Sequence, residues 1–398
     1  MMNAALKHWR EAATLILAAG HRLGADSLLP RTPPSVSPHS PSESSGERAQ
    51  PPLSSRFNYD ILLLKRSAKS GFMPNAYVFP GGVLDPSDFS GDWLDIFKPF
   101  STCPNFGLRL TKQPVETRPA IFATDRLKLG SPIPGDVALR ICALRETFEE
   151  SGVLLVVPKA EVKSFKDDCP SKHYKEPPFS ENELSEWRAL VNQNPTNFIR
   201  MCRELEVLPN IWALHEWANW ITPVGIYGRR FDTAFFLCCL QEIPHTIQDE
   251  KEIVDFQWST PSEILQCYQE RQMWMAPPQF YELSRMCCLP RLNDLHSFAY
   301  KRAVEGCEQW LPVALLENEQ YISLLPGDKQ YPQDTSGQME ADTTPDHELN
   351  NPEKQSALHR MTIKDSYTTA LRVTIKPKYK HLLPVMEPAS PQGTKSQL

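Results

Sequence analysis

Residues 145–153 read Arg-Glu-Thr-Phe-Glu-Glu-Ser-Gly-Val and form the end of a predicted helix. The helix is expected to begin at Asp136, which follows Pro134-Gly135 and is a good N-cap residue. Gly152 ends it, because glycine readily adopts the left-handed conformation that terminates helices. Apolar residues between these limits recur at helical spacing and predict one buried face: Val137, Leu139, Ile141, Leu144 and Phe148.

Three carboxylates crowd one face of this helix near its end. Glu146, Glu149 and Glu150 stand at positions i, i+3 and i+4, where like charges repel each other. A hard divalent cation such as Mg²⁺ would neutralise them, since it prefers oxygen ligands. Arg145 precedes Glu149 by four residues and can hold that carboxylate in place. The alternative is an acidic helix end in solvent, but negative charge is unfavourable there, so the pattern favours a metal site.

The composition is that of a folded protein without a strong affinity for nucleic acid. Of its 398 residues, 41% are hydrophobic and 23% are charged, which is close to the usual globular mixture. The formal net charge of −6 makes nucleic acid unlikely as the main partner. The sequence contains no run of 18 apolar residues, so it predicts no membrane-spanning helix. The ten cysteines are scattered and are interpreted as reduced thiols.

The remaining pattern predicts a mixed α/β chain with two long polar segments. Residues 30–56, rich in Pro and Ser, and the polar segment 327–358 are expected to be flexible. Residues 182–219, rich in Trp and Leu, are predicted to be helical, and another helix starts at Thr260. Strands are predicted at 12–19, 59–66, 153–157, 231–240, 252–258 and 369–377, with a hairpin at 311–325. The strand at 59–66 would pair with the first strand across the loop.

Residues 145–153 resemble the second half of the Nudix box, G-x5-E-x7-R-E-U-x-E-E-x-G-U, where U is apolar. Only Thr147 departs from it, because a larger apolar residue is common at that position. Upstream, Phe79-Pro80-Gly81-Gly82 resembles the start of the first half of the box. Asp88 then stands at the position where the family usually has Glu.

The two halves of the box are unusually far apart in the sequence. Residues 89–144 separate them, 56 residues in place of seven, and we assign 89–135 as an insertion within the box. A competing start at Gly130 would make Asp136 the acidic residue, but it is one residue out of register with Arg145. The start at Gly82 is preferred because it follows a predicted strand and contains the paired glycines that a tight loop needs.

The stretch before the box resembles the signature of Nudix coenzyme A pyrophosphatases, L-L-T-x-R-S/A-x3-R-x3-G-x3-F-P-G-G. The spacing is preserved and Arg66 is retained. Gly71 stands where the signature has a second Arg, and Asn75 where it has Gly, so a second basic group must come from elsewhere. Several further segments resemble the acyl-coenzyme A diphosphatases of this family, among them Arg-Arg-Phe-Asp-Thr-Ala-Phe-Phe at 229–236.

The resemblance implies the fold and the domain organisation. It implies an α/β/α sandwich with a mixed sheet and additional helices, in a Nudix hydrolase domain at 8–325 that includes 182–219 as a helical insertion. Residues 359–398 would then form a C-terminal strand and tail.

It also implies hydrolysis of the pyrophosphate bond of coenzyme A and acyl-coenzyme A, giving 3′-phosphoadenosine 5′-phosphate and (acyl-)4′-phosphopantetheine. The implied cofactor is Mg²⁺ or Mn²⁺, held by Glu146, Glu149 and Glu150, with Arg145 as a further catalytic residue. Substrate would be bound by Arg66, Gly81, Gly82, Arg229 and Arg230, although a solvated loop is an equal interpretation of the last two.

Several points stay open at this stage. The general base is either a glutamate of the box or one of Asp249, Glu250 and Glu252, for which a polar loop is the alternative. Another nucleoside diphosphate derivative, such as ADP-ribose, a dinucleotide or capped RNA, is a second candidate substrate. A catalytically inactive nucleotide-binding module is a third reading. Residues 273–275, Met-Trp-Met, could line an acyl groove, but core packing is the preferred interpretation.

The two ends of the sequence contain alternative candidate targeting signals. Ser396-Gln397-Leu398 is a variant of the S-K-L peroxisomal signal, so a peroxisomal import receptor is an expected partner. A mitochondrial presequence is the alternative, because Lys7, Arg10 and Arg22 lie in an amphipathic start. The peroxisome is preferred, since residues 12–19 are needed as a core strand.

Overall fold

The computed structural model describes residues 9–21, 57–100, 102–161, 178–223, 229–248, 252–317, 320–332 and 357–385. The predicted loop at 30–56, most of 327–358 and the tripeptide at 396–398 lie outside these residues. None of the helices in the described segments is long and apolar enough to cross a membrane.

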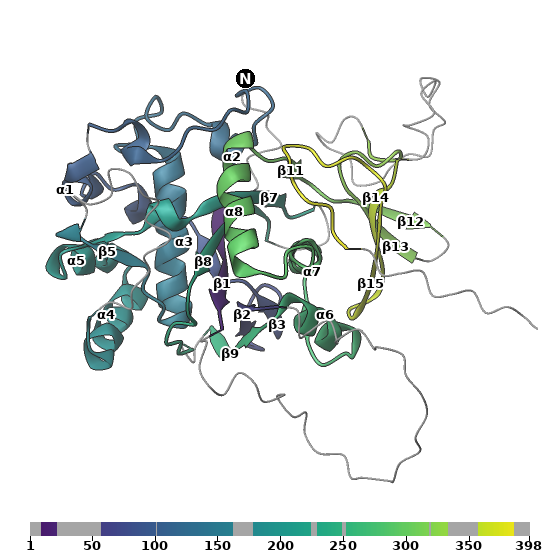
Figure 1. The fold of residues 1–398 in the computed structure, drawn as a ribbon, viewed down its shortest axis with the longest axis horizontal. Coiled ribbons are helices and arrows are strands. Elements are labelled where there is room, and N and C mark those ends of the chain that lie inside the picture. The colour runs from purple at the N-terminus through teal and green to yellow at the C-terminus, as the bar shows by residue number, and fades with distance from the viewer. Residues whose placement is uncertain are drawn as a thin grey trace, which may run out of the picture.

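A mixed sheet runs through the molecule, with strand order β10-β3-β2-β1-β8-β7-β11 (Figure 1). Its central strand β1 (Arg10–Gly20) pairs in parallel with β8 (Phe231–Leu240). The other edge of β1 is shared between two partners, β2 (Tyr59–Arg66) at its end and β4 (Gly81–Val83) near its start. The predicted pairing of the first two strands is confirmed, and β4 places two glycines beside the central strand.

The other elements extend and cover this sheet. On one side, β9 (Ile253–Ser259) pairs with β2, and β3 (Ala76–Val78) is followed by β10 (Trp274–Met275). On the other, β7 (His215–Ile221) is followed by β11 (Gln309–Trp310). The helices are α1 (Trp93–Ile96), α2 (Ala120–Ala123), α3 (Gly135–Ser151), α4 (Glu181–Gln193), α5 (Thr196–Glu204), α6 (Pro261–Gln269), α7 (Pro277–Met286) and α8 (Leu292–Arg302).

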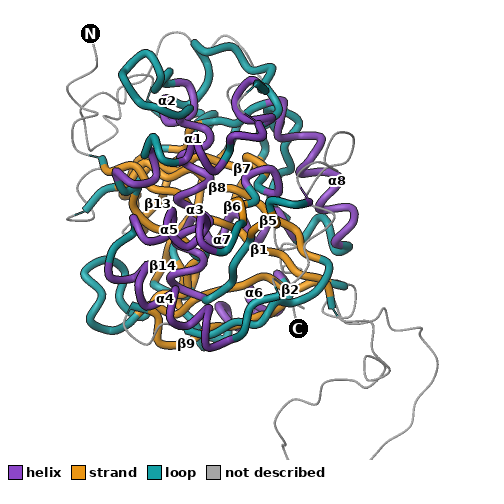
Figure 2. Tube along the Cα trace, turned by 90° about the vertical axis from the view of Figure 1, so that its left-hand side faces the viewer, coloured by secondary structure: helices purple, strands orange, loops and turns teal. Residues whose placement is uncertain are grey.

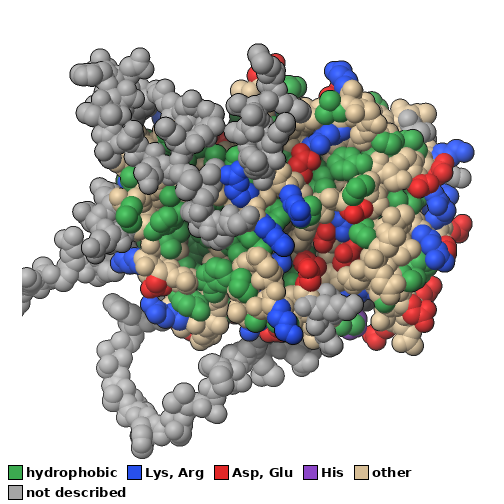
Figure 3. All heavy atoms as spheres, turned by 180° about the vertical axis from the view of Figure 1, so that it is seen from behind, with side chains coloured by type: hydrophobic (Ala, Val, Ile, Leu, Met, Phe, Trp, Pro, Cys, Tyr) green, Lys and Arg blue, Asp and Glu red, His purple; other side chains and the backbone are tan. Residues whose placement is uncertain are grey.

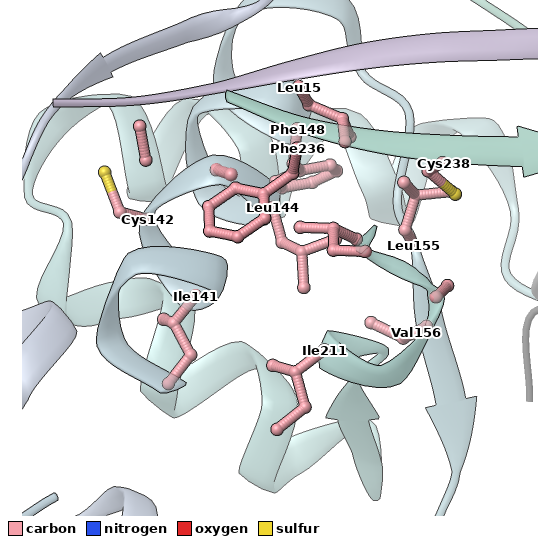
Figure 4. Close-up of a cluster of buried hydrophobic side chains, with 14 of the residues drawn as sticks. Leu15, Ile141, Cys142, Leu144, Phe148, Leu155, Val156, Ile211, Phe236 and Cys238 are labelled. Carbon is pink, nitrogen blue, oxygen red and sulfur yellow. The ribbon is translucent and has the colours of Figure 1, made fainter. Parts of the chain in front are cut away.

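Helices pack on both faces of the sheet, as the alternation of side chains along each strand requires. In β1, Leu15 and Leu17 contact the cluster that contains α3, whereas Ile16 and Ala18 contact the one that contains α7 and α8. Figure 4 shows the first cluster, in which Leu144 and Phe148 of α3 lie close to strands of the sheet. In Figure 2, α8 lies at the right-hand edge of the molecule, apart from α3 near the centre of the view. The predicted α/β/α sandwich is thus confirmed.

Helix α3 contains the first seven residues of the segment 145–153. It spans Gly135–Ser151, and Gly152 follows with φ 72° in the left-handed conformation, so the predicted end is confirmed. The predicted N-cap is wrong by two positions, because Pro134 is the N-cap residue and Asp136 lies inside the first turn. The Asp136 carboxylate instead accepts a hydrogen bond from Asn105 Nδ2 at 3.4 Å.

The insertion at 89–135 is packed into the core. Its aromatic side chains at Trp93, Phe97 and Phe106 are buried in the cluster that contains α3. Arg118 binds Glu216 of β7 through two hydrogen bonds of 2.9 and 2.6 Å, and both side chains are almost fully buried. The insertion therefore covers one face of the sheet and is tied to it by charge as well as by packing.

The helical prediction for 182–219 is correct only as far as Glu204. After α4 and α5 the chain forms β6 (Val207–Pro209) and then β7, whose seven residues are all buried. Two tryptophans lie in β7, and aromatic residues favour strands. The error arose because a short, fully buried apolar strand has no alternation that distinguishes it from a helix.

The predicted strand at 153–157 is also shorter than expected. Only β5 (Val156–Pro158) forms a ladder, which pairs with β6. Val153 and Leu154 are buried next to it without belonging to a strand. These residues were assigned from hydrophobicity alone, which reports burial but not hydrogen bonding.

A second sheet lies at the opposite end of the molecule from α4 and α5 (Figure 1). It consists of β12 (Val313–Glu317), β13 (Gln320–Leu324), β14 (His359–Asp365) and β15 (Thr368–Val373) in that order; we call it the C-terminal sheet. The predicted hairpin and last strand are confirmed, whereas β14 was not predicted. The sheet joins strands from both sides of the domain boundary that was placed at residue 325.

Candidate active site

The two halves of the split box meet in space through Arg145. Its guanidinium donates from Nε and Nη2 to the two carboxylate oxygens of Asp88, both at 2.9 Å. Both side chains are buried, with 2% and 1% of their surface exposed. Asp88 therefore takes the structural place that the resemblance gave it, and the 56 intervening residues leave the contact intact. The competing residue, Asp136, lies instead near Arg118 and Arg140.

The same arginine positions two of the three glutamates. Arg145 Nη1 donates to Glu146 Oε1 at 2.9 Å and to Glu149 Oε1 at 2.8 Å. The contact with Glu149 is the predicted i, i+4 pair, and the contact with Glu146 was not foreseen. Arg145 thus links the loop that contains Asp88 to the carboxylates of α3.

The paired glycines of β4 approach α3 closely. The Gly81 N–H donates to Glu150 Oε2 at 2.9 Å, which fixes the third glutamate. A Cβ atom on Gly82 would lie 2.4 Å from the Glu146 carboxyl group, and one on Gly81 would lie 2.5 Å from the Ala13 carbonyl oxygen. Any side chain at these two positions would collide with the site or with β1. The sequence prediction that both glycines belong to the site therefore has a steric reason.

Burial and mutual repulsion disfavour the charged form of the glutamates. Burial raises the pKa of Glu146 to about 7, against the opposing effect of Arg145 and with a further increase from Glu149. Burial also raises the pKa of Glu149 and, together with the charge of Glu146, that of Glu150. Such a cluster needs a positive charge to stay ionised near neutral pH.

The donor set suits a hard divalent cation. The hydrogen bonds given above engage one oxygen of each glutamate, which leaves the other oxygen to face a ligand. Carboxylate oxygens are what Mg²⁺ and Mn²⁺ prefer. Within the described residues, no three acidic, His or Cys side chains already surround a common point.

A large cavity opens beside the three glutamates. Its volume is about 900 Å³, at the upper end of the range for ligand sites. Glu146, Glu149 and Glu150 line it together with Gly81 and Gly82. Acidic and basic side chains gather beside an apolar area on the face of the molecule shown in Figure 3.

Two of the three predicted arginines lie in the wall of this cavity. Arg66 donates from Nε and Nη2 to Ser70 Oγ, and its positive charge lowers the pKa of Glu150. Arg229 approaches Gly71: a Cβ atom on that glycine would lie 3.5 Å from Arg229 Nη1. Arg229 therefore provides the second basic group that the sequence analysis required. It lies beside Gly71, the residue that stands where the coenzyme A signature has arginine. Arg230 is placed elsewhere, with its guanidinium 4.1 Å from the ring centroid of Trp9.

One member of the predicted acidic trio reaches the site. Glu252 lines the cavity, and its charge raises the pKa of Glu150. Asp249 and Glu250 lie outside the described residues. Glu252 is thus the candidate general base among the three, next to the glutamates of the box.

Sequence reasoning missed much of the cavity wall. Phe231, Thr233 and Phe235 alternate along β8 and all face the cavity, which period-2 spacing alone could have suggested. Gln279 of α7 and three residues of the C-terminal sheet, Tyr321, Ser323 and Ile363, also line it. No local pattern points to these four, because they depend on tertiary contacts. The Met-Trp-Met segment at 273–275 packs instead, as preferred: Met273 and Met275 are buried in the second core.

A glutamate-bearing helix joined by arginine to a glycine loop, on an α/β/α sandwich, defines the site as that of a Nudix hydrolase. Comparisons with known proteins agree. The family model described as the NUDT19 Nudix domain matches residues 9–286, and that of the NUDT19 C-terminal domain matches 314–374. The chain therefore belongs to the NUDT19 family of Nudix hydrolases and is an enzyme.

Similar curated proteins cover nearly the whole chain. One from Xenopus laevis, "Acyl-coenzyme A diphosphatase NUDT19", is 46% identical over 96% of this chain and 97% of its own. The protein of the same name from Homo sapiens is 40% identical over 94% of each chain. A solved NUDIX hydrolase from Alicyclobacillus acidocaldarius is 20% identical, covers 73% of this chain and 96% of its own, and has a TM-score of 0.48.

Proposed function

We propose that the protein hydrolyses the pyrophosphate bond of coenzyme A and acyl-coenzyme A, using Mg²⁺ or Mn²⁺. The products would be 3′-phosphoadenosine 5′-phosphate and (acyl-)4′-phosphopantetheine. One observation carries the proposal: the glutamates of α3, Arg66 and Arg229 line one large cavity whose wall also includes many apolar side chains. The names of the relatives at 40–46% identity support the same substrate class.

The acidic residues and the residues that position them have separate roles in the proposed reaction. A cation held by Glu146, Glu149 and Glu150 would neutralise charge on the pyrophosphate and lower the pKa of the attacking water. Arg145 fixes two of these carboxylates, and the Gly81 N–H fixes the third.

The remaining charges act on the substrate and on the water. Arg66 and Arg229 place positive charge in the wall, where phosphate oxygens can accept hydrogen bonds from them. Glu252 lies on the same cavity and is our candidate for accepting the proton of the attacking water.

Product analysis tests the substrate. Purified protein is incubated with coenzyme A, palmitoyl-coenzyme A, ADP-ribose or capped RNA in the presence of Mg²⁺ or Mn²⁺, and products are identified by mass. The proposal expects the highest kcat/KM on the coenzyme A compounds. Faster hydrolysis of ADP-ribose or capped RNA would reject it.

A matched pair of variants tests whether the glutamates are catalytic. Glu150→Gln keeps the shape of the side chain and removes its charge, so activity should fall by at least about 100-fold. Glu204→Gln, which changes an exposed side chain at the end of α5, serves as the control and should leave activity unchanged. Equal activity of Glu150→Gln and the parent would reject the catalytic role of this glutamate and favour another catalytic group, whereas no activity in either protein would favour an inactive binding module.

We further propose the peroxisome as the site of action, on the basis of Ser396-Gln397-Leu398. A fluorescent protein fused before the first residue leaves this tripeptide free. The fusion should colocalise with a peroxisomal marker and become diffuse when the tripeptide is deleted. Colocalisation of an untagged chain with mitochondria, detected by antibody, would support the alternative address.

A further inference from the structure

The cavity continues well beyond the glutamates, and its far part differs in chemistry. Phe231 and Phe235 of β8 and Trp220 of β7 add aromatic surface to the cavity, where the two phenylalanines pack against Phe72 and Phe79. The indole N–H of Trp220 donates to Glu282 Oε1 at 2.8 Å, so this polar group is satisfied away from the ligand space. What β7 and β8 present there is therefore mainly apolar.

Helix α7 contributes a second apolar wall through its first turn. Pro277 and Pro278 occupy the first helical positions and line the cavity. Proline has no backbone N–H, so this helix start lacks two of the donors that would attract a phosphate. The wall is thus suited to an apolar group and not to an anion.

The C-terminal sheet closes the far end. Tyr321 and Ser323 lie two residues apart on β13, and Ile363 of β14 is the direct partner of Tyr321 in the register. The three residues share one face of the sheet, and all line the cavity. The C-terminal sheet therefore contributes one wall of the cavity.

The C-terminal sheet is firmly attached to the Nudix domain at this point. Met361, on the same face as Ser323, is fully buried in the core cluster that contains α7 and α8. His359 Nε2 shares a hydrogen bond of 2.8 Å with the Tyr281 hydroxyl. Tyr268 and Thr369 are joined by another of the same length. The end wall is thus held in a fixed position.

One polar side chain in this apolar region has an unsatisfied atom. Gln279 lines the cavity with 8% of its surface exposed, and its Oε1 atom has no hydrogen-bond partner within the described structure. A buried acceptor without a partner is unfavourable, so it is expected where a ligand supplies the donor. The pantetheine arm of coenzyme A carries two amide N–H groups of this kind.

We infer that the far part of the cavity is the binding site for a fatty-acyl chain, with the C-terminal sheet as its end wall. A rotation of the Gln279 side chain would turn its buried, unpaired Oε1 atom toward the pantetheine arm that leads into this site. This inference rests on the proposed function, since it assigns the acyl-coenzyme A substrate to a place in the structure. It gives the C-terminal sheet the role of limiting acyl-chain length.

Filling the end of the site tests the inference. Ile363→Trp adds bulk inside the cavity, whereas Ala370→Trp adds it to an exposed residue on the opposite face of the same sheet. We expect Ile363→Trp to lower kcat/KM for palmitoyl-coenzyme A by about 10-fold or more and for coenzyme A by less than about 2-fold. Ala370→Trp should change neither value. Equal effects of Ile363→Trp on both substrates, or none, would overturn the inference.

A second variant keeps the test independent of the folding of the first. Gln279→Leu preserves volume and removes the unpaired oxygen, so Tm should stay the same or rise. KM for coenzyme A and palmitoyl-coenzyme A should rise together by about 10-fold. A lower Tm with unchanged KM would show a purely structural role and would reject the contact with pantetheine. A parent protein that cleaves no coenzyme A compound would refute the proposed function itself, which is a different result from loss of chain-length selectivity.

Discussion

The buried contact between Asp88 and Arg145 offers the sharpest test of the structure, because it alone joins the two halves of the split box by charge. The perturbations are Arg145→Lys and Asp88→Asn, singly and together. Lysine keeps the positive charge but loses the two parallel hydrogen bonds of 2.9 Å to Asp88. Asparagine keeps the shape of Asp88 and loses its charge.

The magnitude follows from burial. Removing one partner of a buried ion pair leaves the other uncompensated, which typically lowers the free energy of unfolding by about 3–5 kcal/mol. Asp88→Asn removes one of the two charges and should cost about 3 kcal/mol, since Glu146 and Glu149 still neutralise part of the charge at position 145. Arg145→Lys keeps its charge, so its expected loss of about 3 kcal/mol comes from the buried hydrogen bonds to Asp88 that lysine does not form. The second substitution then removes little more, so the double variant should lose about 4 kcal/mol and the coupling energy should be about 2 kcal/mol. Activity should fall about 10- to 100-fold, because the carboxylates lose their orientation.

Urea unfolding followed by tryptophan fluorescence measures the four free energies, and initial rates on coenzyme A measure activity. The control cycle uses Asp92→Asn and Arg203→Lys, an ion pair of 3.3 Å whose side chains are half exposed. Each control variant should cost less than about 0.5 kcal/mol. Additive free energies for Asp88 and Arg145 would refute the reasoning, since two residues in direct buried contact cannot act independently.

Three further predictions concern the glycine loop, the insertion and the C-terminal sheet. Gly82→Ala should lower kcat about 10- to 100-fold with little change in Tm, because the new Cβ displaces the Glu146 carboxylate; unchanged kcat would contradict the close approach. Arg118→Met should lower the free energy of unfolding by about 3–5 kcal/mol, since it leaves the buried Glu216 unpaired. Calorimetry measures this loss, and the double variant with Glu216→Gln should recover part of it. Burial lowers the pKa of His359 to about 4, so the unfolded state binds more protons below pH 6.5 and stability falls as the pH drops from there. Urea unfolding at pH 7.5 and pH 5 should reveal a loss of stability to which His359 contributes about 2 kcal/mol, in addition to His215 and His381, whose pKa values burial also lowers. His359→Gln should reduce the loss by that share, and an identical loss in the variant would disprove the assignment.

Local signals in the sequence predicted the elements that bear the chemistry. The glutamate spacing and Gly152 defined α3, and the paired glycines identified the loop that contacts it. The capping box at Thr260 and Glu263 correctly predicted the start of α6. These features succeeded because each depends on residues within one or two turns of chain.

Elements that depend on tertiary context were not predictable in the same way. The sequence pattern wrongly predicts a helix at β7, because burial on both faces of this strand removes the alternation of polar and apolar residues. Gln279 and Ile363 reach the cavity only because α7 and the C-terminal sheet pack around it. The position of Arg229 beside Gly71 depends on a contact across more than 150 residues of sequence, which no spacing rule contains.

The split in the box also changes how this enzyme must fold. Asp88 and Arg145 close a loop with 56 residues between them, whereas an unsplit box closes one with seven. The additional entropy of loop closure is about 2 kcal/mol, since it grows with the logarithm of loop length. A motif that could otherwise form early and locally has become a long-range contact, and such contacts slow folding. We therefore expect catalytic competence to be acquired late in refolding, after the aromatic residues of the insertion have packed.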